Sequence, residues 1–185
     1  MTMNAPVIAN LILIILEIIG ISKSRSRGLI LLIFYTQLSN IVTLISSVAY
    51  LISSGSPLTV ALRYLSTVML AMTVLITLFV LIPAGMGFAD MMLSGNGLYH
   101  HTLCPAISIA SYFLWEQHSS QWFIPVIVTL IYGIVMLYLN YAKIIEGPYP
   151  FFRVYEQSKK ASVLWMIGLT AFISLISLAV VFLAR

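Results

Sequence analysis

The chain has very few charged residues. Of its 185 residues only 8% are Asp, Glu, Lys or Arg, whereas 61% are hydrophobic and the mean hydropathy is +1.07. An average soluble domain carries about 25% charged residues, which solvate its surface. The composition therefore excludes a soluble globular domain and a disordered chain, and it is typical of a polytopic α-helical membrane protein.

Cysteine and histidine are also scarce. A single cysteine, Cys104, excludes an intrachain disulfide. The three histidines, at positions 100, 101 and 118, have no spacing typical of metal ligands. The sequence predicts neither a disulfide scaffold nor a metal site, and we expect no cofactor.

The net charge of +4 comes largely from two short linkers rather than from a continuous basic surface. Their basic residues are Lys23, Arg25 and Arg27 in the first and Lys143, Arg153, Lys159 and Lys160 in the second. Basic linkers between apolar spans are topology signals and contacts for anionic lipid headgroups. We therefore expect membrane lipids as partners and no nucleic acid, while the oligomeric state stays open.

Long apolar runs predict six membrane spans. A bilayer crossing needs about 20 predominantly apolar residues. The spans are expected at 5–22, 28–53, 61–83, 98–115, 122–142 and 161–183. No change of composition marks a domain boundary, so residues 1–185 are expected to form a single transmembrane domain, an all-α bundle of six helices.

Positive charge is unequally divided between the two sides that six spans would create. The linkers near 23–27, 84–97 and 143–160 share one side and carry seven Lys or Arg residues, and the other side carries two, Arg63 and Arg185. The positive-inside rule places the richer side in the cytoplasm. Both termini are then expected to face outward.

Polar residues recur at helical spacing in three of the predicted spans. They are Thr36, Asn40, Thr43 and Ser47 in the second span, His101, Cys104, Ser108 and Ser111 in the fourth, and Thr170, Ser174 and Ser177 in the sixth. Steps of three and four residues place side chains on one helix face, so these seams are expected to face the bundle interior. Ser and Thr can instead bond their own backbone. Asn40 is costlier to leave unpaired in lipid, and we expect it to pair with another helix or a ligand.

Three acidic residues lie in or beside the predicted spans. Glu17 lies well inside the first span, and we expect it to snorkel or to pair with Arg25 or Arg27, with a role in a site as the alternative. Asp90 and Glu116 lie at span ends and are expected to be solvated.

The linker at 146–153 contains two prolines around Tyr149 and two following phenylalanines. Proline fixes φ and removes a backbone donor, so this segment is expected to form a stiff turn. It is either a lid over an opening on the cytoplasmic side or an aromatic anchor at the headgroup level.

Three motifs resemble the androgen-induced and androgen-dependent TFPI-regulating protein family, whose name refers to the tissue-factor pathway. They are residues 35–40 (YTQLSN), 101–105 (HTLCP) and 147–151 (GPYPF). The wider group includes bacterial six-span proteins of about this size, so the resemblance implies a bacterial inner-membrane protein. Its eukaryotic members, which are longer, are intramembrane hydrolases that cleave fatty acid esters of hydroxy fatty acids.

The resemblance implies Thr36 as the nucleophile and His101 as the general base. The adjacent His100 is an alternative for the functional histidine. The implied substrate is such a fatty acid ester or a similar lipid ester. His101 would accept the Thr36 hydroxyl proton, and an acyl-enzyme would form before water releases the acid. The tetrahedral oxyanion needs N–H donors, for which Gln37 and Asn40 are candidates. Asn40 is favoured because it lies one turn from Thr36, and no carboxylate is evident to orient His101.

Three other interpretations remain open. Cys104 lies three residues after His101 on the same helix face, as a Cys–His membrane acyltransferase would require. The polar seams could hold a ligand or permeant in a non-enzymatic lipid-binding or small transport protein. In a structural assembly subunit, the seams would face a partner protein and enclose no cavity.

Overall fold

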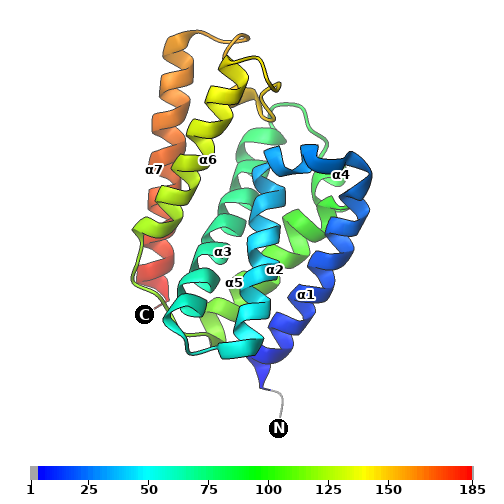
Figure 1. The fold of residues 1–185 in the computed structure, drawn as a ribbon, viewed down its shortest axis with the longest axis vertical. Coiled ribbons are helices and arrows are strands. Elements are labelled where there is room, and N and C mark those ends of the chain that lie inside the picture. Colours follow the sequence, from blue (N-terminus) through cyan, green and yellow to red (C-terminus); the bar gives the residue numbers. More distant parts are fainter. Residues whose placement is uncertain (1–3, 185) are drawn as a thin grey trace.

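The structure, a computed structural model, describes residues 4–184 apart from the side chains of residues 25–27. The chain is 79% helical, and the described residues form no strand. The α-helices are α1 (Ala5–Ser24), α2 (Tyr35–Ser53), α3 (Pro57–Ile76), α4 (Phe88–Met92), α5 (Cys104–Trp115), α6 (Phe123–Tyr141) and α7 (Lys159–Leu183) (Figure 1). Two 3₁₀ segments, η1 (Arg25–Ile33) and η4 (Pro150–Phe152), and two π-helical segments, η2 (Thr77–Leu81) and η3 (Leu98–Leu103), complete the fold.

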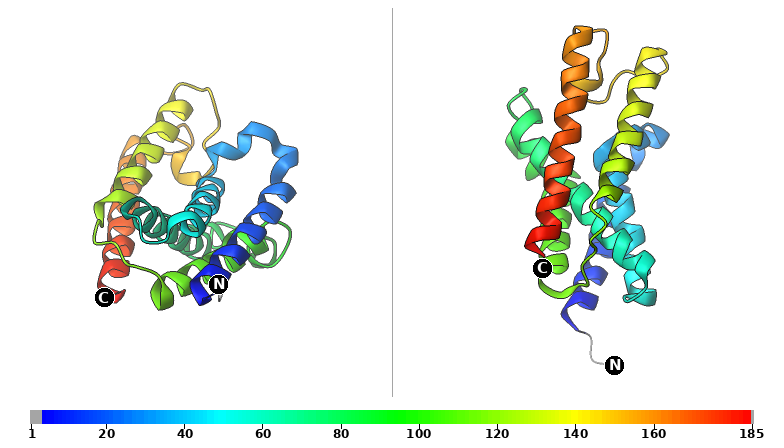
Figure 2. Two further views of the ribbon diagram at one scale, coloured as in Figure 1. Left: turned by 60° about the horizontal axis from the view of Figure 1, so that its bottom comes forward. Right: turned by 90° about the vertical axis from the view of Figure 1, so that its left-hand side faces the viewer.

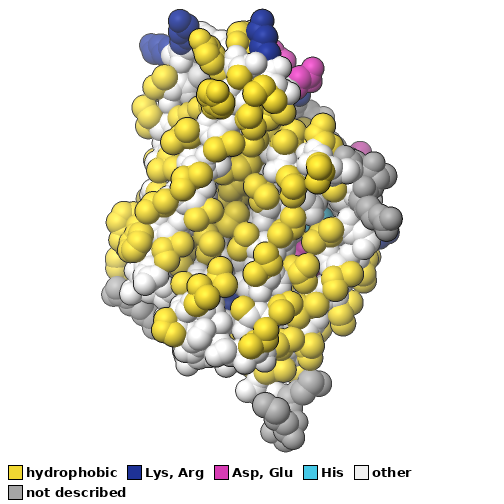
Figure 3. All heavy atoms as spheres, viewed as in Figure 1, with side chains coloured by type: hydrophobic (Ala, Val, Ile, Leu, Met, Phe, Trp, Pro, Cys, Tyr) yellow, Lys and Arg dark blue, Asp and Glu magenta, His cyan; other side chains and the backbone are white. Residues whose placement is uncertain are grey.

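The bundle has a four-helix part and a two-helix part. Helices α1, α2, α3 and α5 pack together, while α6 and α7 pack against each other and against α3 (Figures 1 and 2). The linkers at 25–34, 82–97 and 142–158 lie at one end of the bundle, as the alternation of spans requires (Figure 1). Apolar side chains cover much of the outer surface, and Lys and Arg side chains gather at the end that holds the α6–α7 linker (Figure 3).

Five helices are long and apolar enough to cross a membrane: α1, α2, α3 extended by η2 (Pro57–Leu81), α6 and α7. Side chains that would be costly in water, such as Ile52 and Phe79, are at least 70% exposed on the outside of the bundle. The prediction of an all-α integral membrane protein is confirmed, whereas the count of six spans is not. The fourth predicted span, 98–115, consists of η3 and the 12-residue α5.

The second helix begins later than predicted. The sequence placed its start at 28, but Gly28 has a φ of 60° and Phe34 is extended (φ −88°, ψ 125°). A positive φ interrupts a right-handed helix, and glycine adopts it at little cost. Helix α2 therefore begins at Tyr35, and Thr36 lies in its first turn rather than deep within a span.

Glu116 is buried, and the prediction that it would be solvated is wrong. It is 7% exposed and forms a bidentate ion pair with Arg63, with Nε–Oε2 at 2.7 Å and Nη2–Oε1 at 3.0 Å. The carboxylate also accepts hydrogen bonds from Asn10 and Ser111. Serine side chains from three helices surround the guanidinium: they belong to Ser46, Ser47, Ser66 and Ser108. Small hydroxyl residues thus replace water around this pair, whereas Asp90 is exposed as expected.

The aromatic linker enters the bundle instead of lying at its surface. Tyr149, Phe151 and Phe152 are all less than 8% exposed and belong to the hydrophobic core. A close backbone approach makes this path possible, because a Cβ on Gly147 would lie 2.6 Å from the carbonyl carbon of Phe152. The burial of Tyr149 favours the lid interpretation over the headgroup anchor.

Gly147→Ala is expected to lower the free energy of unfolding by about 1–3 kcal/mol, the usual cost of overpacking. The added methyl group meets backbone, which cannot rotate away, so the linker must shift. Gly168→Ala is the matched control: apart from its chain neighbours and the nearby backbone of α7, no described atom lies within 4 Å of its Cβ position. Thermal unfolding in one detergent would compare them, and equal stabilities would show that the linker's path is not constrained by Gly147.

Candidate active site

The backbone of Thr36 is held from two directions. Its carbonyl oxygen accepts hydrogen bonds from Asn40 Nδ2 at 2.6 Å and from Ser39 Oγ at 2.9 Å. Ser39 Oγ is also 3.1 Å from Thr73 Oγ1 on α3, which ties the first turn of α2 to the neighbouring helix. The position of Thr36 is therefore set by its own helix and by α3.

Tyr149 contacts Thr36 from the α6–α7 linker. Because Thr36 lies in the first turn of α2, its N–H has no partner within the helix. It donates instead to Tyr149 Oη at 3.4 Å. The two hydroxyl oxygens are 3.5 Å apart. Burial raises the pKa of the Tyr149 hydroxyl, an effect that its hydrogen bonds with Thr36 partly oppose, so the phenol stays neutral at neutral pH. Because its oxygen accepts from the Thr36 amide, its proton is free to point at Thr36 Oγ1.

His101 is held by a threonine that the sequence did not single out. Its Nδ1 lies 2.8 Å from Thr77 Oγ1, and Thr77 Oγ1 in turn donates to the Thr73 carbonyl at 2.8 Å. A threonine hydroxyl has one proton, so once it donates to Thr73 its oxygen accepts from His101 Nδ1–H. The remaining nitrogen, Nε2, is then unprotonated and able to act as a base. Thr77 and His101 both lie in π-helical segments, which are frequent at functional sites.

Thr36 and His101 line the same cavity, which has a volume of about 340 Å³. Gln37, His100 and Tyr149 line it as well. Thr36 and His101 share no hydrogen bond within the described part of the chain, because Thr36 faces Tyr149 and His101 is bonded to Thr77. The structure therefore brings the two predicted catalytic residues to one cavity without joining them directly.

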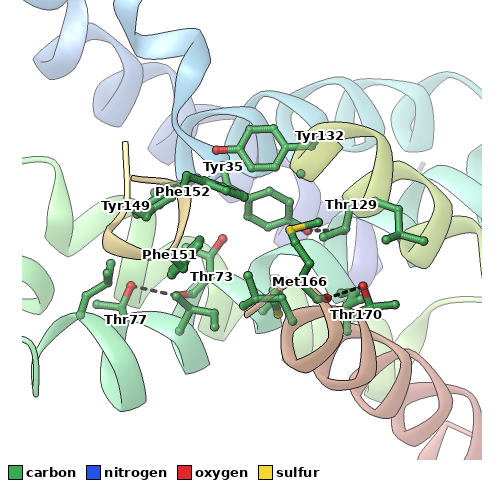
Figure 4. Close-up of a pocket in the computed structure, with 18 residues that line it drawn as sticks. Tyr35, Thr73, Thr77, Thr129, Tyr132, Tyr149, Phe151, Phe152, Met166 and Thr170 are labelled. Carbon is green, nitrogen blue, oxygen red and sulfur yellow. Dashed lines mark hydrogen bonds between the residues drawn. The ribbon is translucent and has the colours of Figure 1, made fainter. Parts of the chain in front are cut away.

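A second, mainly apolar cavity of about 50 Å³ adjoins the first (Figure 4). Its labelled lining includes the aromatic rings of Tyr132, Phe151 and Phe152 and the thioether of Met166. Thr36 and Tyr149 line both cavities and so form part of the wall between them.

The geometry separates the roles of Gln37 and Asn40. Gln37 lines the larger cavity, and its buried Nε2 has no hydrogen-bond partner among the described residues. Asn40 lies outside both cavity linings and bonds its own helix through Thr36, leaving Oδ1 without a partner in that part of the chain. Gln37 is therefore better placed to meet an oxyanion, and Asn40 to hold Thr36.

Glu17 faces a histidine rather than the solvent. It is fully buried, and its Oε2 lies 4.0 Å from Nε2 of His100, which is 1% exposed. The predicted pairing with Arg25 or Arg27 lies outside the described side chains. Since His100 has a carboxylate beside it and His101 has a threonine, the two histidines occupy different environments.

Cys104 is fully buried and absent from the lining of both cavities. An acyltransferase nucleophile must reach its substrate, so this position does not favour the Cys–His interpretation.

The polar seams of α2 and α5 face inward, with Asn40, Thr43, Ser47, Cys104, Ser108 and Ser111 all fully buried. On α7, Thr170 and Ser174 bond their own backbone, and Ser177 donates to the Trp122 carbonyl. Seams that are buried inside the protein do not fit an assembly subunit whose seams face a partner.

The sequence did not predict two residues of the site. They are Thr77, which contacts His101, and Tyr149, which contacts Thr36. Thr77 lies four residues after Thr73 in the third predicted span. That spacing is a possible signal, but it does not reveal which helix the hydroxyl faces.

Comparisons with known proteins assign no family. No family model matches the chain, and no curated protein and no solved structure matches it.

Proposed function

We propose that this protein is an intramembrane lipid-ester hydrolase with Thr36 as nucleophile and His101 as general base. It would form a six-span bundle in a bacterial inner membrane with the basic linkers in the cytoplasm. The observation that carries the proposal is that Thr36 and His101, far apart in the sequence, line one cavity. The resemblance of residues 35–40 and 101–105 to the intramembrane threonine hydrolases supports the same roles.

In the proposed reaction, His101 Nε2 accepts the Thr36 hydroxyl proton as Oγ1 forms a bond to the ester carbonyl carbon. The carbonyl π electrons move to oxygen and return as the alcohol leaves, taking the proton from His101. Water, with its proton accepted by His101, then releases the fatty acid and restores Thr36. Catalytic hydrogen bonds are often long without substrate, and the present separation of Thr36 and His101 is consistent with that behaviour.

The surroundings of the pair support each step. Thr77 keeps Nδ1 of His101 protonated and so leaves Nε2 as the base. Gln37 Nε2 and the Tyr149 hydroxyl are the donors available to an oxyanion at Thr36. The apolar cavity beyond Tyr149 suits a short stretch of acyl chain, and the larger one suits the polar ester and water.

Labelling with a lipophilic fluorophosphonate tests the proposal, because the probe reacts with an activated hydroxyl and loses fluoride. We expect the wild-type protein in detergent to be labelled and Thr36→Ala and His101→Ala to be unlabelled. Thr43→Ala is the matched control, since Thr43 also lies on α2 but is fully buried, bonds its own backbone and lines neither cavity. Labelling that survives in Thr36→Ala contradicts the proposal, and loss only in Cys104→Ala indicates a cysteine nucleophile.

A non-enzymatic lipid-binding or transport protein is the second candidate, and one observation favours it. Ionisable residues buried between membrane helices often mark ion or proton pathways, and Glu17 with His100 is such a pair. Wild-type protein that binds lipid esters without labelling or hydrolysis would support this candidate.

A further inference from the structure

Glu17 and His100 form a buried pair that the proposed hydrolase chemistry does not use. Their side chains are 0% and 1% exposed, and Oε2 and Nε2 are 4.0 Å apart. Among the described residues, His100 Nε2 has no hydrogen-bond partner, and the Glu17 carboxyl has only the thiol of Cys104, a weak donor, beside it. Buried polar atoms are normally paired with strong donors or acceptors, so a carboxyl group and an imidazole nitrogen that face each other at 4.0 Å need an explanation.

His100 packs unusually close to α1. Gly20 lies one turn after Glu17 on α1, and a Cβ there would lie 2.4 Å from His100 Nε2. Only glycine lets the imidazole approach α1 this far. His100 also lines the larger cavity, so it connects Glu17 to a space that has room for water.

The other titratable groups around the pair leave its charge uncompensated. His101 lies beside His100, the Cys104 thiol of α5 lies beside Glu17, and Asp90 lines the larger cavity with His100. Among the described side chains, no Lys or Arg forms an ion pair with Glu17. If the pair lost its one titratable proton, Glu17 would be a buried carboxylate beside a neutral His100. If the pair gained a second proton, His100 would be a buried imidazolium beside a neutral Glu17. Both states are costly in a membrane interior.

We propose that Glu17 and His100 form a proton-binding site, in which Glu17 carries one proton at neutral pH and exchanges it with the larger cavity through His100. The ligand is a proton, and the site goes beyond the proposed hydrolysis at Thr36.

The geometry places the proton on Glu17. An ion pair of Glu17 with a protonated His100 would be stabilised by a charge-assisted hydrogen bond, which spans about 2.7–2.9 Å. The observed 4.0 Å is too long for such a bond, and no described N–H group donates to the carboxylate. Two neutral partners avoid both charges.

Infrared spectroscopy of the full-length protein in lipid vesicles tests this site. At neutral pH we expect the carbonyl-stretch band of a protonated carboxylic acid, which Glu17→Gln removes and Glu17→Asp shifts. Asp90→Asn is the matched control, because it removes an exposed carboxyl group that lines the same cavity and should leave the band unchanged. In deuterated water the band should shift quickly in the wild type and at least tenfold more slowly in His100→Phe.

The absence of the band in the folded wild-type protein would overturn the protonation of Glu17. A band that persists in Glu17→Gln or is lost in Asp90→Asn would assign the proton to another residue. Equal exchange rates in wild type and His100→Phe would overturn the route through His100. Because the measurement needs no substrate, its result is independent of whether Thr36 hydrolyses esters.

Discussion

Glu116→Gln is expected to lower the free energy of unfolding by about 3–5 kcal/mol, because it leaves a buried guanidinium without its counter-ion. Arg63 is 1% exposed and loses a bidentate partner, while the serine hydroxyls around it supply dipoles but no negative charge. Denaturant unfolding in one detergent would measure the difference.

Two controls separate the buried charge from the loss of contacts. Glu156→Gln breaks the exposed pair with Arg153, in which the side chains are 67% and 43% exposed, and should cost about 1 kcal/mol or less. The double variant Arg63→Met/Glu116→Leu removes both charges and should be more stable than Glu116→Gln alone. A double variant less stable than the single one would mean that the network is needed for its hydrogen bonds rather than its charge balance.

Thr77→Val is expected to slow fluorophosphonate labelling and ester turnover about 100-fold, at the lower end of what a general base contributes. Valine keeps the shape of threonine but cannot accept the Nδ1–H of His101, so the imidazole loses the partner that fixes its tautomer. Substrate contacts remain, so kcat should fall while KM changes little. Thr77→Ser, which retains the hydroxyl, should recover most of the rate.

The ¹⁵N spectrum of the histidines gives a readout that a purely structural role of Thr77 would not change. In the wild type, His101 should be protonated at Nδ1, and Thr77→Val should produce a mixture of tautomers. A His101 protonated at Nε2 in the wild type would rule out this role. Unchanged turnover in a folded Thr77→Val protein would show that His101 needs no orienting partner.

Much of the fold could be predicted from the sequence, because apolar runs of bilayer length predict helices directly. Five of the predicted spans begin or end within two residues of an end of α1, α2, α5, α6 or α7. The start of α2 could not be predicted, since a run of apolar residues continues through the break at Gly28 and Phe34. The burial of Glu116 depends on hydroxyl groups from other helices, and their convergence is a tertiary property.

The candidate site was predicted in part. Family resemblance supplied Thr36 and His101, and the structure places both at one cavity. It could not supply Thr77 or Tyr149, because the contacts of each depend on packing between segments that are distant in the chain. The sequence favoured Asn40 over Gln37 as the oxyanion donor, but Gln37 lines the cavity and Asn40 bonds the Thr36 carbonyl. This difference also depends on packing, because residues on one helix can face different surroundings.

The late start of α2 gives Thr36 an electrostatic setting that a helix begun at Gly28 would not have provided. Aligned peptide dipoles leave about half a positive charge at a helix N-terminus, and the effect is confined to the first turn. Thr36 is the second residue of the 19-residue α2. The field of α2 therefore favours negative charge on Thr36 Oγ1 by about 0.3–2 kcal/mol, with the larger values in partly buried surroundings. The extended conformation of Phe34, which makes α2 begin at Tyr35, thus places the positive end of the helix dipole at the candidate nucleophile.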